Sequence, residues 1–190
     1  MCDKPANASP VALDRATILK ALAALSDALK AQGVVGERCL FGGTAMVLAY
    51  SARVSTKDVD ALFQPTQPIR DLSRQIAAQL DIPESWLNDG VKGFVSDRHE
   101  LIAGNLPQFP NLRLTMPTPE YLLAMKCMAA RLGGLQGEPS DVPDILFLIK
   151  HLGLRSAKDT LDLVACYYPA DRVPVKTQYL IEGLFEEGKV

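Results

Sequence analysis

Two carboxylates spaced one residue apart are the side chains of this sequence best suited to chemistry. Asp58 and Asp60 stand at the start of the apolar run VDALF. In an extended chain, alternate side chains point to the same side, about 6–7 Å apart along the strand, so the two charges repel each other. Such a pair is either a solvated strand end or a binding site for a divalent cation.

A Gly-Gly turn precedes this pair. Gly42 and Gly43 join an apolar strand expected at 38–41 to an apolar helix expected at 44–50. Glycines allow the backbone to approach a ligand closely, and a helix that begins at Thr44 offers unpaired N–H groups to a phosphate. Mg²⁺ prefers one or two carboxylates together with phosphate oxygens. The glycine turn and the aspartate pair together therefore predict a magnesium–phosphate site. On spacing alone, an ordinary tight turn beside a solvated strand end is equally consistent.

Lys126 is the single charge in the run YLLAMKCMAA, which has the pattern of a buried helix. Burying an unpaired ammonium is costly, so this side chain must reach either water or an anionic partner. It reaches into the phosphate site, or it extends past the small alanines to the surface. Asp141 and Asp144 open the next helix as N-cap and first-turn residues, and that helix start could also face the site.

The elements that position these residues follow from apolar periodicity and from caps. The mixed first part and the helical last part predict an α+β fold with a short mixed sheet flanked by helices, divided into a core at 1–117 and a helical portion at 118–190 packed on it. Besides the segments above, strands are expected at 58–63 and 112–116, and helices at 11–32, 67–80, 118–132, 141–152, 157–168 and 175–187.

Composition excludes several classes of function. The chain has 190 residues, is 48% hydrophobic and carries a net charge of −2, with 20 basic residues scattered among 22 acidic ones, so no duplex-DNA surface is expected. We expect no membrane span and no signal peptide. The cysteines show no metal-ligand spacing, and Cys39, Cys127 and Cys166 lie in apolar stretches, which predicts free thiols and a cytoplasmic protein.

Two longer segments resemble a known superfamily. FGGTAMVLAYSARVSTKDVDALF resembles the signature of the DNA polymerase β-like nucleotidyltransferases: a hydrophobic residue, Gly-Gly, a helix, then Asp-hydrophobic-Asp-hydrophobic. TPEYLLAMKCMAARL followed by SDVPDILFLI is similar to the lysine and aspartate motifs of abortive-infection-type nucleotidyltransferase toxins and their uncharacterised bacterial relatives. The resemblance spans roughly residues 38–185.

The resemblance implies a minimal nucleotidyltransferase core that transfers NMP from an NTP to RNA or protein with Mg²⁺. It also implies membership of a toxin–antitoxin or phage-defence system, with a cognate antitoxin as a partner. By position, the implied metal ligands are Asp58 and Asp60; the implied catalytic residues are Asp58, Asp60, Lys126 and Asp144; the implied nucleotide-binding residues are Gly42, Gly43, Thr44, Lys126 and Asp141.

One departure from the family pattern affects the mechanism. The strand LRLTM at 112–116 lacks the carboxylate that many members carry there, so Asp97, Glu100, Asp141 and Asp144 are the alternatives for activating the attacking hydroxyl. The competing hypothesis is a catalytically reduced nucleotidyltransferase fold that binds nucleotide or protein. A DxD glycosyltransferase ranks third, because 190 residues leave little room for its nucleotide-sugar domain.

Overall fold

The computed structural model describes residues 12–132 and 140–190, and within them the chain forms a mixed α+β fold around a small mixed sheet. The strands are β1 (Leu13–Asp14), β2 (Gly36–Leu40), β3 (Ser55–Thr56), β4 (Val59–Gln64), β5 (Leu87–Asn88), β6 (Leu101–Ile102) and β7 (Leu112–Pro117). The α-helices are α1 (Arg15–Ala31), α2 (Gly42–Leu48), α3 (Thr66–Leu80), α4 (Pro119–Ala129), α5 (Val142–His151), α6 (Ala157–Tyr167) and α7 (Val175–Glu186).

The five-stranded sheet has the order β5-β4-β2-β7-β6. Its central strand β2 runs antiparallel to β4 and parallel to β7, while β5 runs parallel to β4 and β6 antiparallel to β7. The carboxyl ends of β2 and β7 therefore meet the amino ends of β4 and β5 at one edge of the sheet. Open sheets that contain parallel strands commonly bind ligands at this kind of edge.

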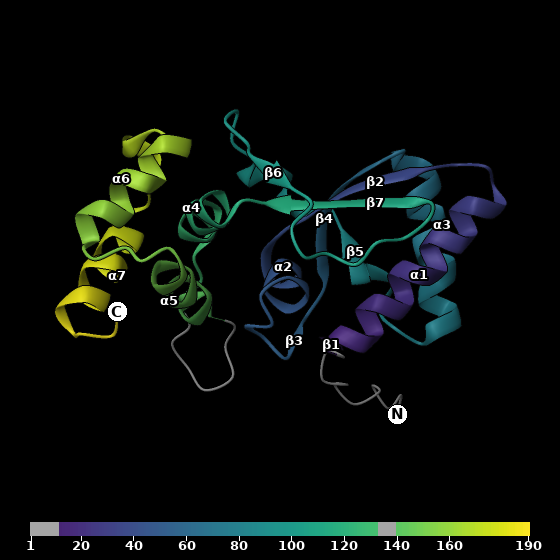
Figure 1. The fold of residues 1–190 in the computed structure, drawn as a ribbon, viewed down its shortest axis with the longest axis horizontal. Coiled ribbons are helices and arrows are strands. Elements are labelled where there is room, and N and C mark those ends of the chain that lie inside the picture. The colour runs from purple at the N-terminus through teal and green to yellow at the C-terminus, as the bar shows by residue number, and fades with distance from the viewer. Residues whose placement is uncertain (1–11, 133–139) are drawn as a thin grey trace, which may run out of the picture.

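Helices α1 and α3 pack together on one side of the sheet, at the end opposite α4–α7 (Figure 1). The apolar stripe of α1 is fully buried at helical spacing, through Ile18, Leu22, Leu25 and Leu29. An added Cβ at Gly36 on β2 would lie 2.8 Å from the end of the Leu29 side chain, so this glycine lets helix and strand approach closely.

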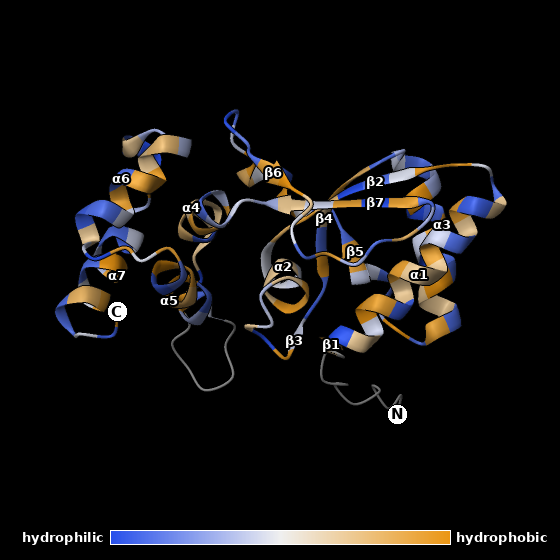
Figure 2. Ribbon diagram, viewed as in Figure 1, coloured by the Kyte–Doolittle hydropathy of each residue, from blue (hydrophilic) through white to orange (hydrophobic). Residues whose placement is uncertain are grey.

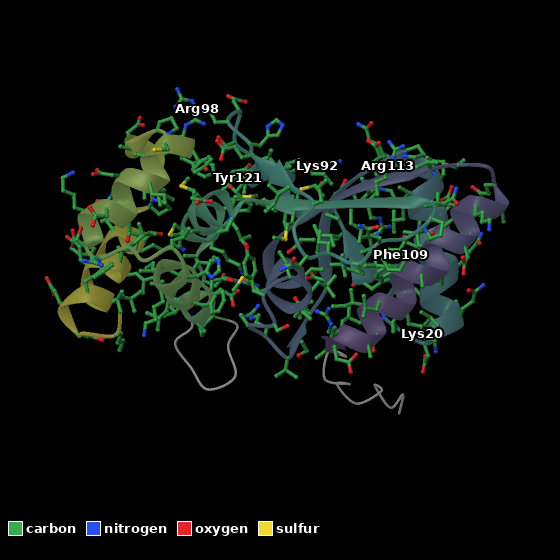
Figure 3. All side chains as sticks on the ribbon, in the orientation of Figure 1. Lys20, Lys92, Arg98, Phe109, Arg113 and Tyr121 are labelled. Carbon is green, nitrogen blue, oxygen red and sulfur yellow. The ribbon has the colours of Figure 1, made fainter. Side chains whose placement is uncertain are left out.

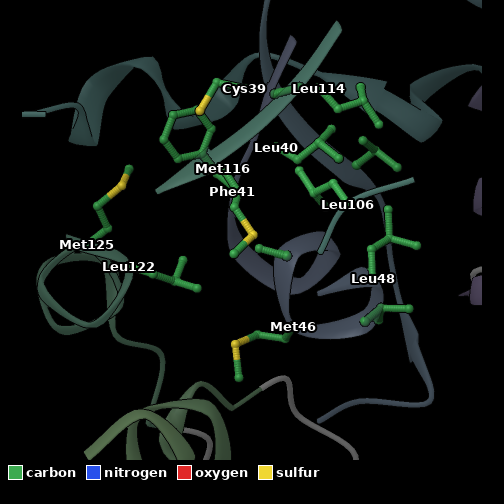
Figure 4. Close-up of a cluster of buried hydrophobic side chains, with 14 of the residues drawn as sticks. Cys39, Leu40, Phe41, Met46, Leu48, Leu106, Leu114, Met116, Leu122 and Met125 are labelled. Carbon is green, nitrogen blue, oxygen red and sulfur yellow. The ribbon is translucent and has the colours of Figure 1, made fainter. Parts of the chain in front are cut away.

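The last four helices form the other end of the molecule, where α4 packs against α5 and α6 (Figure 1). Thr118 caps α4 by accepting a hydrogen bond from the Tyr121 backbone N–H at 3.3 Å. Apolar residues line the sides of α4 and α5 that pack inward (Figure 2). Leu122 and Met125 of α4 belong to the same buried core as Phe41, which follows β2, and Met46 of α2 (Figure 4).

The α+β class and the principal helices predicted from the sequence are confirmed, with ends shifted by a few residues. The start predicted for α2 at Thr44 was wrong, because the helix begins at Gly42. Cys39 and Cys127 are buried free thiols, as predicted, but Cys166 is exposed. Gly133 and Gly134, which follow the helix predicted at 118–132, lie outside the described residues. Across the described ranges, no helix combines the length and apolarity needed to cross a membrane.

Candidate phosphate- and metal-binding site

A pocket of about 620 Å³ lies at the sheet edge described above, between the sheet and α4. Six candidate site residues named by the sequence analysis line it from four separate segments: Gly42, Gly43, Asp58, Asp60, Lys126 and Asp141. We call this the site pocket. Its volume is in the range of ordinary small-ligand sites.

Asp58 and Asp60 both line the site pocket, and both are half-buried. Asp58 precedes β4, whereas Asp60 is its second residue and is paired in register with Asn88 of β5. Burial, together with repulsion from Asp58, raises the pKa of Asp60, while Lys126, Asn88 and Arg131 act in the opposite direction. A divalent cation between the two carboxylates would relieve this repulsion, so the pair fits Mg²⁺ chemically.

The two glycines at the start of α2 are required by contacts within the protein itself. Gly42 has φ +56°, and an added Cβ there would lie 3.0 Å from Asp60 Oδ2. An added Cβ at Gly43 would overlap the Thr56 hydroxyl and lie 3.1 Å from Arg53 Nη1. Both glycines therefore let the turn pack directly against the aspartate strand and the segment before it.

Thr44 does not line the pocket. Its side chain is fully buried, and its hydroxyl donates a hydrogen bond to the Asp58 carbonyl at 3.2 Å. Thr44 thus fixes the backbone that carries the first carboxylate, and the structure places it behind the pocket wall. Because α2 has only seven residues, we assign no phosphate site to its N-terminus.

Lys126 lies at the centre of a charge cluster, which consists of Arg53, Lys126, Arg131, Asp141 and Asp144. Its ammonium donates a hydrogen bond to Asp141 Oδ1 at 2.8 Å. It also forms an ion pair with Asp144 Oδ2 at 2.7 Å, but this contact does not have the geometry of a hydrogen bond. The side chain is only 7% exposed. It lines the site pocket, as predicted, but two carboxylates already neutralise its charge.

Arg131 completes the charge cluster from the chain that follows α4. Its backbone N–H and its Nε both donate to Asp141 Oδ2, at 3.1 and 3.0 Å, and Nη2 donates to Asp141 Oδ1 at 3.2 Å. Burial opposes ionisation of Asp141, but the hydrogen bonds from Arg131 and the charge of Lys126 outweigh it, so its pKa lies well below the ordinary value. Asp141 occupies the N-cap position of α5, as predicted, yet its carboxylate makes no capping hydrogen bond.

Arg53 joins the charge cluster from the opposite side, between α2 and β3. Its Nε lies 3.1 Å from Asp144 Oδ1, and Nη2 donates to the Ser140 carbonyl at 3.2 Å. Arg53 lines the site pocket, whereas Asp144 is buried behind Lys126 and is not among the pocket residues. The network therefore contains three cations and two carboxylates, which leaves a positive surplus beside Asp58 and Asp60.

Two of the proposed substitutes for the missing strand carboxylate lie elsewhere. Asp97 lines a second pocket, of about 790 Å³, beside the end of α6, and Glu100 accepts a hydrogen bond from the Tyr167 hydroxyl at 3.0 Å. On β7, the Thr115 hydroxyl donates to the Arg38 carbonyl at 3.3 Å. Neither Asp97 nor Glu100 is positioned to act in the site pocket.

The structure adds pocket residues that the sequence analysis did not assign to the site. Arg131 stands at the end of an apolar helix, where a cation is favoured by the helix dipole alone, so its type gave no distinct signal. Gly90, Val91 and Phe94 come from a 3-10 turn, η2 (Gly90–Phe94), that contacts both β4 and α4. The one sequence signal that could have pointed to Phe94 as a site residue was an aromatic residue in a glycine-containing loop.

Trp86 is fully buried, and its indole N–H donates to the Ser73 carbonyl at 2.9 Å. Among the described residues, no group of three or more His, Cys, Asp or Glu side chains is arranged to hold a metal ion. A metal bound by Asp58 and Asp60 would therefore take its other ligands from substrate oxygens and water, an arrangement usual for Mg²⁺.

Comparisons with protein-family models, with curated proteins and with solved structures found no match to this chain. The resemblance to nucleotidyltransferases consequently rests on the sequence motifs alone.

Proposed function

We propose that this protein is a Mg²⁺-dependent nucleotidyltransferase of the DNA polymerase β-like type, which transfers NMP from an NTP to a macromolecular acceptor, RNA or protein. One observation carries the proposal. Asp58 and Asp60, the glycine turn, Lys126 and Arg131 come from distant parts of the chain and line one pocket of about 620 Å³. Two carboxylates beside excess positive charge match a magnesium–triphosphate complex.

In this proposal Asp58 and Asp60 hold Mg²⁺. The bound ion would supply Lewis-acid polarisation of the α-phosphate and would neutralise charge on the departing pyrophosphate. The raised pKa of Asp60 supports this role, since a carboxylate whose ionisation is opposed by burial and by a like charge gains from a cation.

Arg131 and Arg53 are the residues we assign to the phosphates. The Arg131 side chain is 58% exposed and lines the pocket, so its guanidinium is accessible to a ligand while it remains bonded to Asp141. Guanidinium groups bind phosphate oxygens in a fork geometry. Lys126 would have to give up a carboxylate to bind phosphate directly, so we assign it to holding Asp141 and Arg131 in place.

In the transfer step, the acceptor hydroxyl oxygen forms a bond to the α-phosphorus. The bond from the α-phosphorus to the bridging oxygen breaks, and pyrophosphate leaves with the electron pair. The hydroxyl proton passes to solvent water, because Asp141 and Asp144 are bound by cations and Asp97 and Glu100 lie outside the pocket. A positioned general base contributes about 10²–10⁴-fold, so we expect slow turnover.

The second candidate is a nucleotide- or protein-binding module without turnover. Thr115 favours this candidate. It lies on β7, the strand where many family members carry a further carboxylate, and its hydroxyl donates a hydrogen bond to the Arg38 carbonyl. Membership of a toxin–antitoxin or phage-defence system, with a cognate antitoxin, stays a proposal that rests on the sequence resemblance.

Each of the four NTPs, labelled on the α-phosphate, should be incubated with the protein, Mg²⁺ and either bulk tRNA or total protein. We expect label in one acceptor fraction from the wild type, none from Asp58→Asn, and wild-type transfer from Asp162→Asn, a control whose carboxylate is 63% exposed. Binding of Mg·NTP without transfer would favour the binding module. Absence of both binding and transfer would contradict the assignment of this pocket as a nucleotide site in either function.

A further inference from the structure

We propose that the apolar wall of the site pocket, formed by Val91, Phe94, Leu122 and Met125, binds the nucleobase of the NTP by stacking, with little discrimination among the four bases. This inference rests on the proposed function, because it places the rest of the same substrate. It assigns a role to η2, which the phosphate and metal chemistry leaves unused.

The pocket changes character along α4. Leu122 and Met125, which line it, come from the middle of the helix; Lys126 and Arg131 follow them along the chain. At about 1.5 Å per residue, Leu122 and Lys126 are about 6 Å apart along the helix axis. An NTP has the same division, with a charged triphosphate at one end and a flat, weakly polar base at the other.

The residues that η2 contributes to the pocket face this apolar part of α4. The turn contacts α4 on one side and β4, the strand of Asp60, on the other. Phe94 lines the pocket and is 41% exposed, although large aromatic side chains are usually well buried. An exposed aromatic ring beside a charged site is a ready surface for a base.

The backbone around Phe94 is held in place from both ends. The Gly90 N–H donates to Asn88 Oδ1 at 2.9 Å, and Asn88 is paired with Asp60 in the sheet. The Phe94 carbonyl accepts a hydrogen bond from the Tyr168 hydroxyl, and the Ser96 N–H donates to the Tyr121 hydroxyl at 2.9 Å. Figure 3 labels Tyr121, which lies on α4, and Arg98, which lies in the loop that follows η2. The aromatic wall is thus tied to the strand that carries the metal ligand.

The chemistry of this wall predicts low base selectivity. Its four side chains are hydrocarbon, aromatic or thioether groups, so they offer contact area and stacking in place of strong hydrogen bonds to the Watson–Crick edge. Every base has a π-face, and stacking on an aromatic residue is accordingly tolerant of base identity. Purines, with the larger ring system, should bind somewhat more tightly than pyrimidines.

Calorimetric titrations test the inference with two probes, magnesium tripolyphosphate and each of the four Mg·NTPs. The proteins are the wild type, Phe94→Ala, Phe94→Trp and Tyr179→Ala, the last a control at an aromatic side chain on α7 that is 70% exposed. Thermal unfolding checks that each variant is folded.

We expect the wild type to bind NTPs more tightly than tripolyphosphate, with the four NTPs within about tenfold of one another. Phe94→Ala should lose about five- to hundredfold in affinity for every NTP and nothing for tripolyphosphate. Phe94→Trp should retain binding, and Tyr179→Ala should match the wild type.

Three results would overturn the inference. Equal affinity of the wild type for tripolyphosphate and NTPs would do so, with the magnesium–phosphate part of the proposed function intact. An unchanged NTP affinity in Phe94→Ala, or a preference above a hundredfold for one base, would exclude stacking as the recognition mode. Failure of the wild type to bind either probe would overturn this inference and the proposed function together.

Discussion

Lys126 forms ion pairs within the fold, although it also lines the site pocket. Its ammonium is buried between Asp141 and Asp144, and that contact alone explains a lysine in an apolar helix. Arg131, by contrast, keeps more than half of its side chain exposed while it lines the same pocket. Loss of Lys126 should therefore mainly reduce stability, whereas loss of Arg131 should mainly reduce ligand affinity.

We expect Lys126→Met to lower the free energy of unfolding by about 3–5 kcal/mol, because two buried carboxylates lose their shared partner. Arg131→Ala should cost about 1 kcal/mol of stability, since Asp141 keeps Lys126 and the backbone N–H. It should instead lower Mg·NTP affinity by about ten- to hundredfold, the loss of a charge-assisted hydrogen bond.

Urea denaturation and calorimetric titration of both variants measure these effects. Arg113→Ala, which removes an exposed ion pair with Glu37 on the sheet, is the control for loss of one positive charge. Wild-type stability of Lys126→Met would contradict the structural role and return Lys126 to direct phosphate binding.

At the scale of elements, the glycine turn and α2 bring the aspartates to the pocket. The turn fits against Asp60 and Thr56 because Gly42 and Gly43 have no side chains. The C-terminal carbonyls of α2 are bound by Arg15 of α1, at 3.1 Å for Val47 and 2.7 Å for Leu48. This short helix is therefore held at both ends by the rest of the fold.

We expect Gly43→Ala to destabilise the protein by about 1–3 kcal/mol, the usual cost of overpacking a buried contact. The added Cβ would overlap the Thr56 hydroxyl. The double variant Gly43→Ala, Thr56→Ala should recover much of that loss, as thermal unfolding will show. No loss in the single variant would mean that this glycine is needed for the ligand only.

Most elements could be predicted from the sequence because they carry their own local signals. The helix at α1 has a clear apolar stripe, α4 has Thr118 as its cap, and α6 has Ser156, whose hydroxyl accepts from the Asp159 N–H at 3.0 Å. The start of α2 was missed because glycines are poor helix formers, so nothing in the sequence signalled that the helix begins at Gly42. The turn η2 has no apolar period, so tertiary contacts decide its conformation.

At the scale of the whole molecule, the charge cluster joins the mixed core to the C-terminal helices. Arg53 comes from the first part of the chain and Asp144 from the last, and the site pocket lies beside their contact. The sequence predicted that Asp58, Asp60, Lys126 and Asp141 lie near one another, but it did not predict Arg131. It could not predict that Asp141 and Asp144 would neutralise Lys126, because residue type does not tell which of several anions a buried cation meets.

The charge cluster predicts a specific form of acid unfolding. Because the pKa of Asp141 is lowered in the folded state, ionised Asp141 stabilises the fold above the ordinary carboxyl pKa of 3.8, and that stability is lost as the pH falls toward the lower folded pKa. The free energy of unfolding should fall steeply below about pH 4 in the wild type and less steeply in Asp141→Asn. Urea denaturation across this range measures both slopes, and equal slopes would contradict the assignment.

The most direct test of the proposed site is Mg²⁺-dependent NTP binding by the wild type, Asp58→Asn and Asp60→Asn, measured by calorimetry with and without the metal. We predict binding by the wild type only when Mg²⁺ is present, and loss of that binding in both variants. Asp60→Asn should unfold at the wild-type temperature or above, because it removes a charge that burial and Asp58 disfavour. Metal-independent binding, or full binding by either folded variant, would contradict the assignment of these aspartates as the metal ligands.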